Sequence, residues 1–549
     1  MRSRRLLPGV FVGLVAVAVY LNALPGAFVY DDNALVRFNA SIRDASGLRS
    51  FFASDLWSRD GQGETNYYRP LPGLIFAAVY GVAGNAPWAF RLVNILLHAL
   101  ASILVLRLLR DLLHERPPEE QPHVATAALA GALLFAVHPV HVEAVAWISG
   151  IMDVASTAFA LLAFDLYRRA DATPRGRVRI ALGLGVFLLA MLSKEPAALL
   201  PAILVAYDLP GRGSRWAGLR PALVRWLPWF AVLGLYLGLR ATALGGLAPH
   251  ARPDLPGLSG SLLIAADLFA RYVRTLFVPV GLSLGHFAAP PVGWTSLRAL
   301  VAIAALLATA ALAWYGWRRH RAMLFGLAVF VLTLVPALYL PGLRPLLSKL
   351  FGERFLYFPS VGWAVVVASA LGLAAARAGR AARFVWIAAA AAALVFTGMT
   401  ARQNLTWRSE LTLWADSVAK YPADGMNYLH YGTALIAAGE REAGRRVLDQ
   451  GRAADPGIVT FHIEQGADYL AQGRPKDAIL KFERALAFDP GSLEAQLGAA
   501  QAYEAAGWNG MAARRYQSVA DTLDKEGEAA RAARLRARAA ALASGGQRP

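Results

Sequence analysis

Long apolar stretches recur along most of this sequence, and they restrict its fold more than any other feature. Of its 549 residues, 56% are apolar and only 17% are charged, which is too apolar for a soluble globular protein. A membrane-spanning helix takes about 17 to 25 residues. We assign eleven spans, near residues 9–29, 87–110, 123–139, 151–167, 178–193, 196–208, 222–240, 297–317, 322–341, 359–376 and 383–403. The sequence therefore predicts an all-α polytopic membrane helix bundle.

The distribution of arginine predicts how these spans are oriented. The net charge of +18 comes mostly from arginine, which in a membrane protein marks cytoplasmic loops rather than a nucleic-acid surface. Arginine clusters fall at alternate span ends, near residues 2–5, 107–110, 168–179, 212–225, 318–321 and 377–383. This places the N-terminus in the cytoplasm and both the loop 30–72 and the chain after 402 on the outer side. We expect an interfacial outer segment at 241–296, because a twelfth span there would move 318–321 outside.

Two adjacent carboxylates, Asp31 and Asp32, follow the first apolar run. A charge at the edge of the hydrocarbon region is costly unless it has a task or a partner, so the pair is a candidate reaction centre. One carboxylate can accept the proton of an attacking hydroxyl, and the other can hold the acceptor or a cation and raise the pKa of its neighbour. The simpler alternative is a solvated pair that caps the following helix.

Further polar residues fall at the predicted outer ends of the spans. They are Arg69, Asn94, His98, His138, His141, Glu143, Asp153, Lys194, Glu353 and Arg354. The basic residues Arg69, Arg354 and Lys194 are suited to the phosphate of a lipid-linked donor, or else they snorkel or pair with carboxylates such as Glu195.

The acidic and histidine residues of this set resemble a metal-ligand list, but their spacing is not that of a zinc helix. The sequence has no cysteine, which also excludes disulfides and cysteine nucleophiles. Hydrogen bonding at helix ends explains these residues equally well. We assign no metal ligands and no cofactor, although the acidic pair is compatible with a divalent cation.

The last third of the chain repeats with a period of 34 residues. Gly439 recurs as Gly473 and Gly507, and Asp455-Pro456 recurs as Asp489-Pro490. This is the tetratricopeptide period, and it predicts an α-solenoid over 404–543 that binds a polypeptide. The solenoid begins with a half repeat near 409–420, and 544–549 is expected to be a disordered tail.

The ordered set of motifs resembles the transmembrane and tetratricopeptide-repeat O-mannosyltransferases. The motifs are Tyr-Asp-Asp at 30–32, Tyr-Arg-Pro-Leu at 68–71, Arg-x-x-Asn-x-x-x-His at 91–98, His-Pro-Val-His-x-Glu-Ala-Val-Ala at 138–146, Lys-Glu at 194–195 and Glu-Arg-x-Leu-Tyr-x-Pro-Ser at 353–360. The chain departs from the family at Ser149-Gly150-Ile151-Met152-Asp153, where the family commonly has Gly-Arg-Ala-Asp. This chain keeps the aspartate of that motif and lacks its arginine.

The resemblance implies a bacterial membrane glycosyltransferase of the GT-C class in residues 1–403. Such an enzyme moves mannose or another hexose from a polyprenyl-phosphate donor to Ser or Thr hydroxyls of exported protein. The family's acidic pair carries over to Asp31 and Asp32, and its arginines to Arg69 and Arg354. Two alternatives stay open: a lipid-linked glycan ligase, polymerase or glycolipid-modifying transferase, and a non-enzymatic scaffold for envelope assembly.

Overall fold

All regular secondary structure in the described part of the chain is helical, as its apolar pattern predicts. The computed structural model describes residues 2–44, 47–57, 66–114, 121–170, 176–208, 219–247, 257–286, 293–338 and 351–545, and no strand occurs in these ranges. The chain divides into two compact units. The first comprises 1–56, 66–284 and 288–412, and the second comprises 57–65, 285–287 and 413–549.

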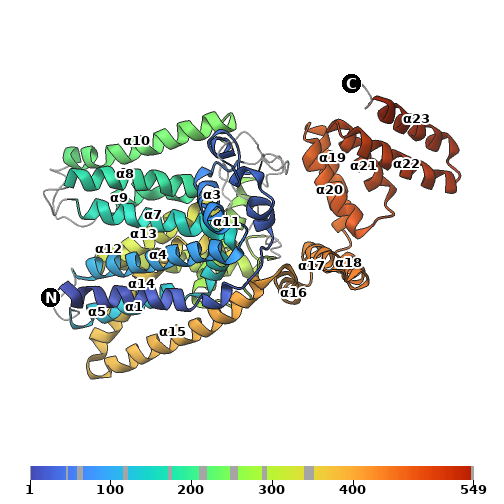
Figure 1. Cartoon of the computed structure of the whole chain (residues 1–549). Coiled ribbons are helices and arrows are strands. Elements are labelled where there is room, and N and C mark those ends of the chain that lie inside the picture. The colour runs from blue at the N-terminus through green and yellow to red at the C-terminus, as the bar shows by residue number, and fades with distance from the viewer. Residues whose placement is uncertain are drawn as a thin grey trace. The chain divides into compact units, whose positions relative to one another are not determined.

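The first unit is a bundle in which a helix overlaps each of the eleven predicted spans (Figure 1). The first span is the poorest match, because the α-helix ends at Ala18 within the predicted 9–29, and residues 339–341 of the predicted span 322–341 lie outside the described ranges. Its longer helices are α1 (Arg2–Ala18), α3 (Pro70–Ala83), α4 (Pro87–His114), α5 (Gln121–Ala136), α7 (Ile151–Arg168), α8 (Gly176–Ser193), α9 (Leu200–Asp208), α10 (Leu219–Leu244), α11 (Leu258–Phe277), α12 (Leu297–Arg319), α13 (Arg321–Leu334), α14 (Pro359–Ala378) and α15 (Ala382–Asn404). Short elements join them, including α2 (Ser50–Ala53), α6 (Val142–Ala146) and the 3₁₀ helix η12 (Glu353–Leu356). The predicted interfacial segment contains α11, while its residues 248–256 and 287–292 lie outside the described ranges.

Fewer helices than eleven are long and apolar enough to cross a bilayer by themselves. Among the described residues six pass this test, or seven if the bent pair Gln121–Ala136 and Pro139–Ala146 forms one span. One of the six, Pro359–Arg408, contains both α14 and α15, which separate at Gly379 (φ 52°). Two shorter apolar helices, Leu7–Ala23 and Arg321–Ala337, fall on other predicted spans, whereas a third, Pro70–Ala83, lies outside all of them. The difference arises because several spans are broken by 3₁₀ turns that shorten the continuous α-helix.

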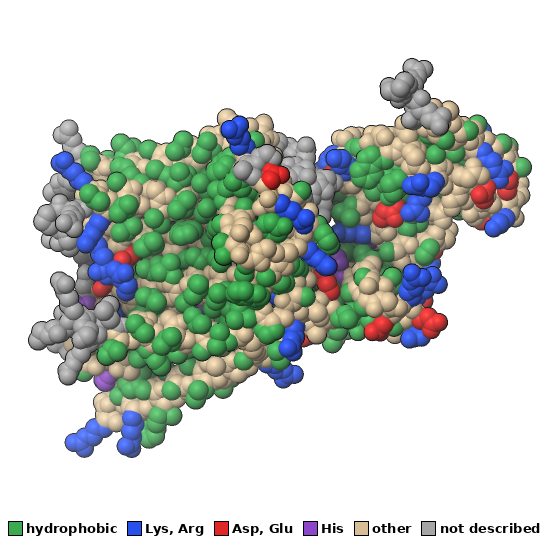
Figure 2. Space-filling model, in the orientation of Figure 1, with side chains coloured by type: hydrophobic (Ala, Val, Ile, Leu, Met, Phe, Trp, Pro, Cys, Tyr) green, Lys and Arg blue, Asp and Glu red, His purple; other side chains and the backbone are tan. Residues whose placement is uncertain are grey.

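The surface of this bundle is apolar along its sides. Figure 2 shows a broad face of hydrophobic side chains over the first unit, with basic side chains at its ends. Large apolar side chains stand exposed on α10 and α12, such as Leu227 (68% exposed) and Leu307 (65% exposed). Exposed leucines on this scale need lipid rather than water, so the protein is a multi-pass membrane protein.

Ion pairs join the arginine-rich helix ends, as the predicted orientation requires. Arg107 at the end of α4 pairs with Asp165 on α7 (2.8 Å), and Arg168 pairs with Asp111 (3.0 Å). These ends of α4 and α7 therefore lie on one side of the bundle. Which side of a membrane this is stays a prediction.

The second unit consists of α16 (Glu410–Lys420), of which it contains the part from Leu413, and a series of helix pairs. These are α17 (Gly425–Ala437) with α18 (Arg441–Ala454), α19 (Ile458–Ala471) with α20 (Pro475–Phe488), α21 (Leu493–Ala505) with α22 (Asn509–Lys525), and the final α23 (Ala529–Gly545). Gly439, Gly473 and Gly507 occupy the turns within the three pairs, and their φ angles are 93°, 71° and 76°. The period of 34 residues thus has a structural cause, because each turn needs a left-handed residue.

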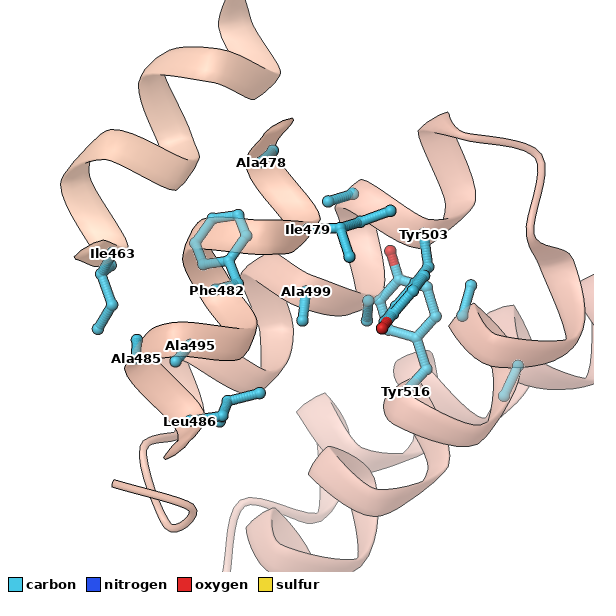
Figure 3. Close-up of a cluster of buried hydrophobic side chains, with 14 residues drawn as sticks. Ile463, Ala478, Ile479, Phe482, Ala485, Leu486, Ala495, Ala499, Tyr503 and Tyr516 are labelled. Carbon is cyan, nitrogen blue, oxygen red and sulfur yellow. The ribbon is translucent and has the colours of Figure 1, made fainter. Parts of the chain in front are cut away.

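The core of the second unit also follows this period. Trp414, Leu448 and Phe482 stand 34 residues apart and all are buried. In Figure 3, Phe482 lies in one cluster with Ala499, Ile479, Tyr503 and Tyr516. Small residues face Phe482, and a Cβ added at Gly498 would lie 2.3 Å from its ring. Of the predicted tail, residues 546–549 lie outside the described residues.

Candidate active site at the polar end of the bundle

The two adjacent carboxylates after α1 have different surroundings. Asp32 is fully buried, and its Oδ1 accepts hydrogen bonds from the backbone N (2.8 Å) and Oγ (2.6 Å) of Ser149, while its Oδ2 accepts one from Val29 N (3.1 Å). Burial raises the pKa of Asp32 to about 6, although these hydrogen bonds and the charge of Arg91 oppose the rise. Asp31 is only half-buried. Asp32 therefore acts as an anchor, and Asp31 is the more accessible carboxylate.

Arg91 on α4 fixes the backbone that leads into this acidic pair. Its side chain is fully buried and donates hydrogen bonds to the carbonyl oxygens of Gly26, Ala27 and Ala146, the last at 2.9 Å. A Cβ added at Gly26 would lie 3.0 Å from the Arg91 guanidinium carbon, so a larger residue there would crowd the guanidinium. Arg91 ties the segment before Asp31 to the loop that contains Ser149.

Each of the three predicted phosphate-binding cations is paired with a carboxylate. Lys194 Nζ lies 2.5 Å from Asp153 Oδ1, Arg354 pairs with Glu143, and Arg69 forms a two-pronged pair with Glu195 (Nε–Oε2 3.0 Å, Nη2–Oε2 2.6 Å). Lys194 thus pairs with Asp153 on α7 rather than with the adjacent Glu195. Carboxylate pairing, one of the two interpretations of these residues, describes all three.

Arg69 and Arg354 differ in how many guanidinium hydrogen-bond donors remain for a ligand. Glu195 occupies Nε and Nη2 of Arg69, and Met152 Sδ lies 3.3 Å from Nη1. Arg354 bonds Glu143 through its backbone N (2.9 Å) and Nη1, and within the described residues no other hydrogen bond to its side chain occurs. Arg354 therefore keeps guanidinium donors that Arg69 does not.

Arg354 interacts electrostatically with both Asp31 and Lys194. Burial lowers the pKa of Arg354, but the charges of Glu143, Asp153 and Asp31 outweigh burial and raise it. Burial also lowers the pKa of Lys194 to about 8, with the charges of Arg69 and Arg354 acting in the same direction and Asp153 opposing them. Residues from five distant stretches thus converge at one end of the bundle.

The remaining polar residues of the predicted set hold the backbone around this site. On α4, Asn94 donates to Trp147 O (2.8 Å), and His98 lies 2.8 Å from Tyr357 Oη and 2.9 Å from Ala136 O. His138 lies 2.9 Å from Leu276 O, and His141 lies 2.8 Å from Ser360 Oγ. Glu353 accepts a hydrogen bond from Ser283 N (2.9 Å). These hydrogen bonds join helices to one another and to the short elements between them. Over the described residues, no group of three or more His, Cys, Asp and Glu side chains is placed to hold a metal ion.

The segment behind the last helix of the bundle contacts Tyr30, the residue before the acidic pair, which sequence motifs do not indicate. Glu410 Oε1 accepts a hydrogen bond from Tyr30 N (2.6 Å), and the ring of Trp407 stacks on Trp147 with centroids 5.7 Å apart. A carboxylate in the first turn of a helix normally just complements the helix dipole, so nothing in the sequence distinguishes Glu410. Arg240, which lies 3.5 Å from Glu195, is equally inconspicuous at the end of an apolar helix.

The fold and site together define a multi-pass helical membrane protein with a charge-paired polar site at one end of its bundle. Residues 69–233 match the family described as dolichyl-phosphate-mannose-protein mannosyltransferase. Over most of its length the chain is similar to the TMTC O-mannosyltransferases.

Three relatives show the extent of this similarity. Protein O-mannosyl-transferase TMTC3 of Mus musculus is 24% identical over 505 residues, which cover 84% of this chain and 53% of the mouse protein. Tmtc3 of Drosophila melanogaster is 25% identical over 566 residues, covering 89% of this chain and 59% of the fly protein. Drosophila Tmtc2 is 35% identical over 203 residues, or 36% of this chain and 21% of that protein. The chain thus spans just over half the length of the first two relatives.

Proposed function

We propose that this protein is a membrane glycosyltransferase that moves mannose or another hexose from a polyprenyl-phosphate donor to Ser or Thr hydroxyls of exported protein. The observation that carries the proposal is the contrast within the acidic pair: Asp32 is buried and anchored, while Asp31 is half-buried beside the charge of Arg354. A base and a cation at one site are what a sugar transfer from a phosphate needs. The names of the family and of the relatives support the same reaction.

In the proposed reaction, Asp31 accepts the proton of the acceptor hydroxyl. The hydroxyl oxygen forms a bond to the anomeric carbon as the bond from that carbon to the phosphate oxygen breaks. The electron pair of that bond leaves with the polyprenyl phosphate, and a single displacement inverts the anomeric centre. Asp32 does not exchange protons in this scheme, because Ser149 and Val29 occupy its oxygens.

The charge that develops on the leaving phosphate is stabilised by the cations of the site. Arg354 is the first choice, because its guanidinium keeps donors after pairing with Glu143. Lys194 supplies a second positive charge, and Arg69 acts mainly by holding Glu195 and the loop around it. Preorganised donors of this kind contribute about 3 to 4 kcal/mol each to transition-state stabilisation.

We also propose that the second unit is a tetratricopeptide solenoid that presents the acceptor polypeptide. Its three 34-residue helix pairs with left-handed glycine turns support this assignment. In the proposed topology the N-terminus is cytoplasmic, and the loop 30–72 and the second unit are periplasmic, at a bacterial inner membrane. A topology reporter fused after Leu411 tests this, and a cytoplasmic signal would refute it.

The Asp31→Asn variant tests the reaction. We expect the glycosylation of exported proteins to fall about 100- to 10,000-fold at equal expression, the usual contribution of a general base. Asp416→Asn is the matched control, since Asp416 pairs with Lys420 on α16 (2.7 Å) outside the site. Mass spectrometry of exported proteins and glycolipids measures the outcome. An unchanged profile with Asp31→Asn contradicts the proposal, and a loss confined to glycolipids favours a glycolipid-modifying transferase.

A further inference from the structure

The residue before the accessible carboxylate has an unusual backbone conformation. Tyr30 has a φ of 53°, and it is the only non-glycine residue with positive φ in the described part of the chain. A bulky L-residue seldom adopts this left-handed region, because its Cβ approaches the following carbonyl oxygen. Such a conformation persists only where the surrounding structure enforces it, and it is found preferentially at active sites.

Glu410 is hydrogen-bonded to the backbone of Tyr30 and to a side chain beside it. Its Oε1 accepts hydrogen bonds from Tyr30 N (2.6 Å) and from Asn33 Nδ2 (3.0 Å). Asn33 Nδ2 also lies 3.4 Å from Tyr30 O, so one carboxylate and one amide bracket the Tyr30 backbone on both sides. Nearby, Ala27 N donates to Arg408 O (2.9 Å), which fixes the same stretch to the segment that contains Glu410.

The conformation of Tyr30 determines where the next side chain points. A change of φ at Tyr30 from positive to negative would turn the following peptide and redirect Asp31 relative to Asp32, which Ser149 holds in place. A misplacement of about 1 Å at a reacting group can lower a rate a hundredfold. The direction of the Asp31 side chain therefore depends on Glu410, which lies 379 positions away in the sequence.

We propose that Glu410 is a positioning residue for the transfer reaction, which keeps Tyr30 left-handed and thereby aims Asp31. Glu410 is the first residue of α16, the helix that continues into the C-terminal unit. This inference rests on the function proposed above.

Glycine at position 30 provides the decisive test, because glycine adopts positive φ without steric strain. The assay uses purified full-length protein with a mannosyl-phosphoryl polyprenol and a Ser/Thr-rich peptide as probes. We expect Glu410→Ala to lower kcat about 10- to 100-fold with little change in KM for the donor. Glu410→Gln keeps the acceptor oxygen and should retain most of the rate, and Asp416→Ala, which removes a carboxylate from the same helix, should match the wild type.

The combination with Tyr30→Gly separates positioning from general destabilisation. In the Tyr30→Gly background, Glu410→Ala should lower kcat much less than it does in the wild type. An equal loss in both backgrounds would overturn the inference. The rate of amide hydrogen exchange at residues 28–33 is a second measurement. This rate should rise with Glu410→Ala and stay unchanged with Asp416→Ala. An unchanged rate with Glu410→Ala would also overturn the inference.

The outcomes also separate this inference from the proposed function. An inactive Asp31→Asn enzyme together with a fully active Glu410→Ala enzyme refutes only the positioning role of Glu410. If Asp31→Asn itself retains full transfer activity, the proposed function fails.

Discussion

Replacing the buried Asp32 by asparagine gives a sharp test of its role as an anchor. Burial raises the pKa of Asp32 from 3.8 to about 6, which corresponds to about 3 kcal/mol of penalty on the ionised form at about 1.4 kcal/mol per pH unit. Asparagine is neutral, so it escapes this penalty. It keeps an acceptor oxygen for Ser149 but turns an amide toward Val29 N, where the lost hydrogen bond costs about 1 to 3 kcal/mol. At pH 7.5 the Asp32→Asn protein should therefore equal the wild type or exceed its stability by up to about 2 kcal/mol.

The dependence of stability on pH follows from the same shift. Between about pH 4 and pH 6 the folded protein keeps a proton on Asp32 that the unfolded chain has already released. The contribution of Asp32 to the free energy of unfolding therefore falls as the pH rises through this window, and it is constant above it. The Asp32→Asn protein has no such contribution.

Thermal unfolding in detergent, followed by tryptophan fluorescence at pH 4.5 and pH 7.5, measures both effects. We expect the wild-type midpoint to fall with rising pH by more than the midpoint of Asp32→Asn. Asp416→Asn serves as the control, because Asp416 is a surface partner of Lys420 and its loss should leave the pH dependence unchanged. Identical pH dependence of the wild type and Asp32→Asn, or strong destabilisation of the variant at pH 7.5, would refute the reasoning.

The remaining predictions concern Lys194, Arg91 and the glycine turns of the repeats. Transfer activity should fall above about pH 8, where Lys194 loses its proton, and Lys194→Arg should remove this alkaline limb in a pH–rate profile; a limb unchanged by the substitution contradicts the assignment. Arg91→Lys cannot serve three carbonyl groups and should lower the free energy of unfolding by about 2 to 5 kcal/mol, seen as a lower thermal midpoint and faster exchange at 26–32. Gly473→Ala should cost about 1 kcal/mol in denaturant unfolding because φ is 71°, whereas Gly510→Ala within α22 should not destabilise.

The pattern of charge and burial in the site was only partly visible in the sequence. The motifs indicated Asp31, Asp32 and the cations Arg69, Lys194 and Arg354, because charged residues at membrane-span ends are conspicuous in an apolar chain. Their partners were not visible. Glu195 pairs with Arg69 and Asp153 with Lys194 across helices that sequence spacing cannot relate.

The helical bundle and the repeats follow from local properties of the sequence. Apolar runs of span length can satisfy their backbone groups in lipid only as helices, and the 34-residue period requires a glycine turn in each helix pair. Both are properties of neighbouring residues, so the sequence by itself determined the all-α class and the glycine turns of the repeats, whereas the breaks within the spans came from the structure.

Only the tertiary structure distinguished the two adjacent aspartates. Neighbours in the sequence share composition and spacing, but Ser149 and Arg91 close around Asp32 while Asp31 stays half-exposed. The positive φ of Tyr30 and its partner Glu410 are likewise invisible in the sequence, since one is a backbone torsion and the other a contact between residues 380 positions apart. Long-range packing therefore determined which carboxylate is accessible and how it is aimed.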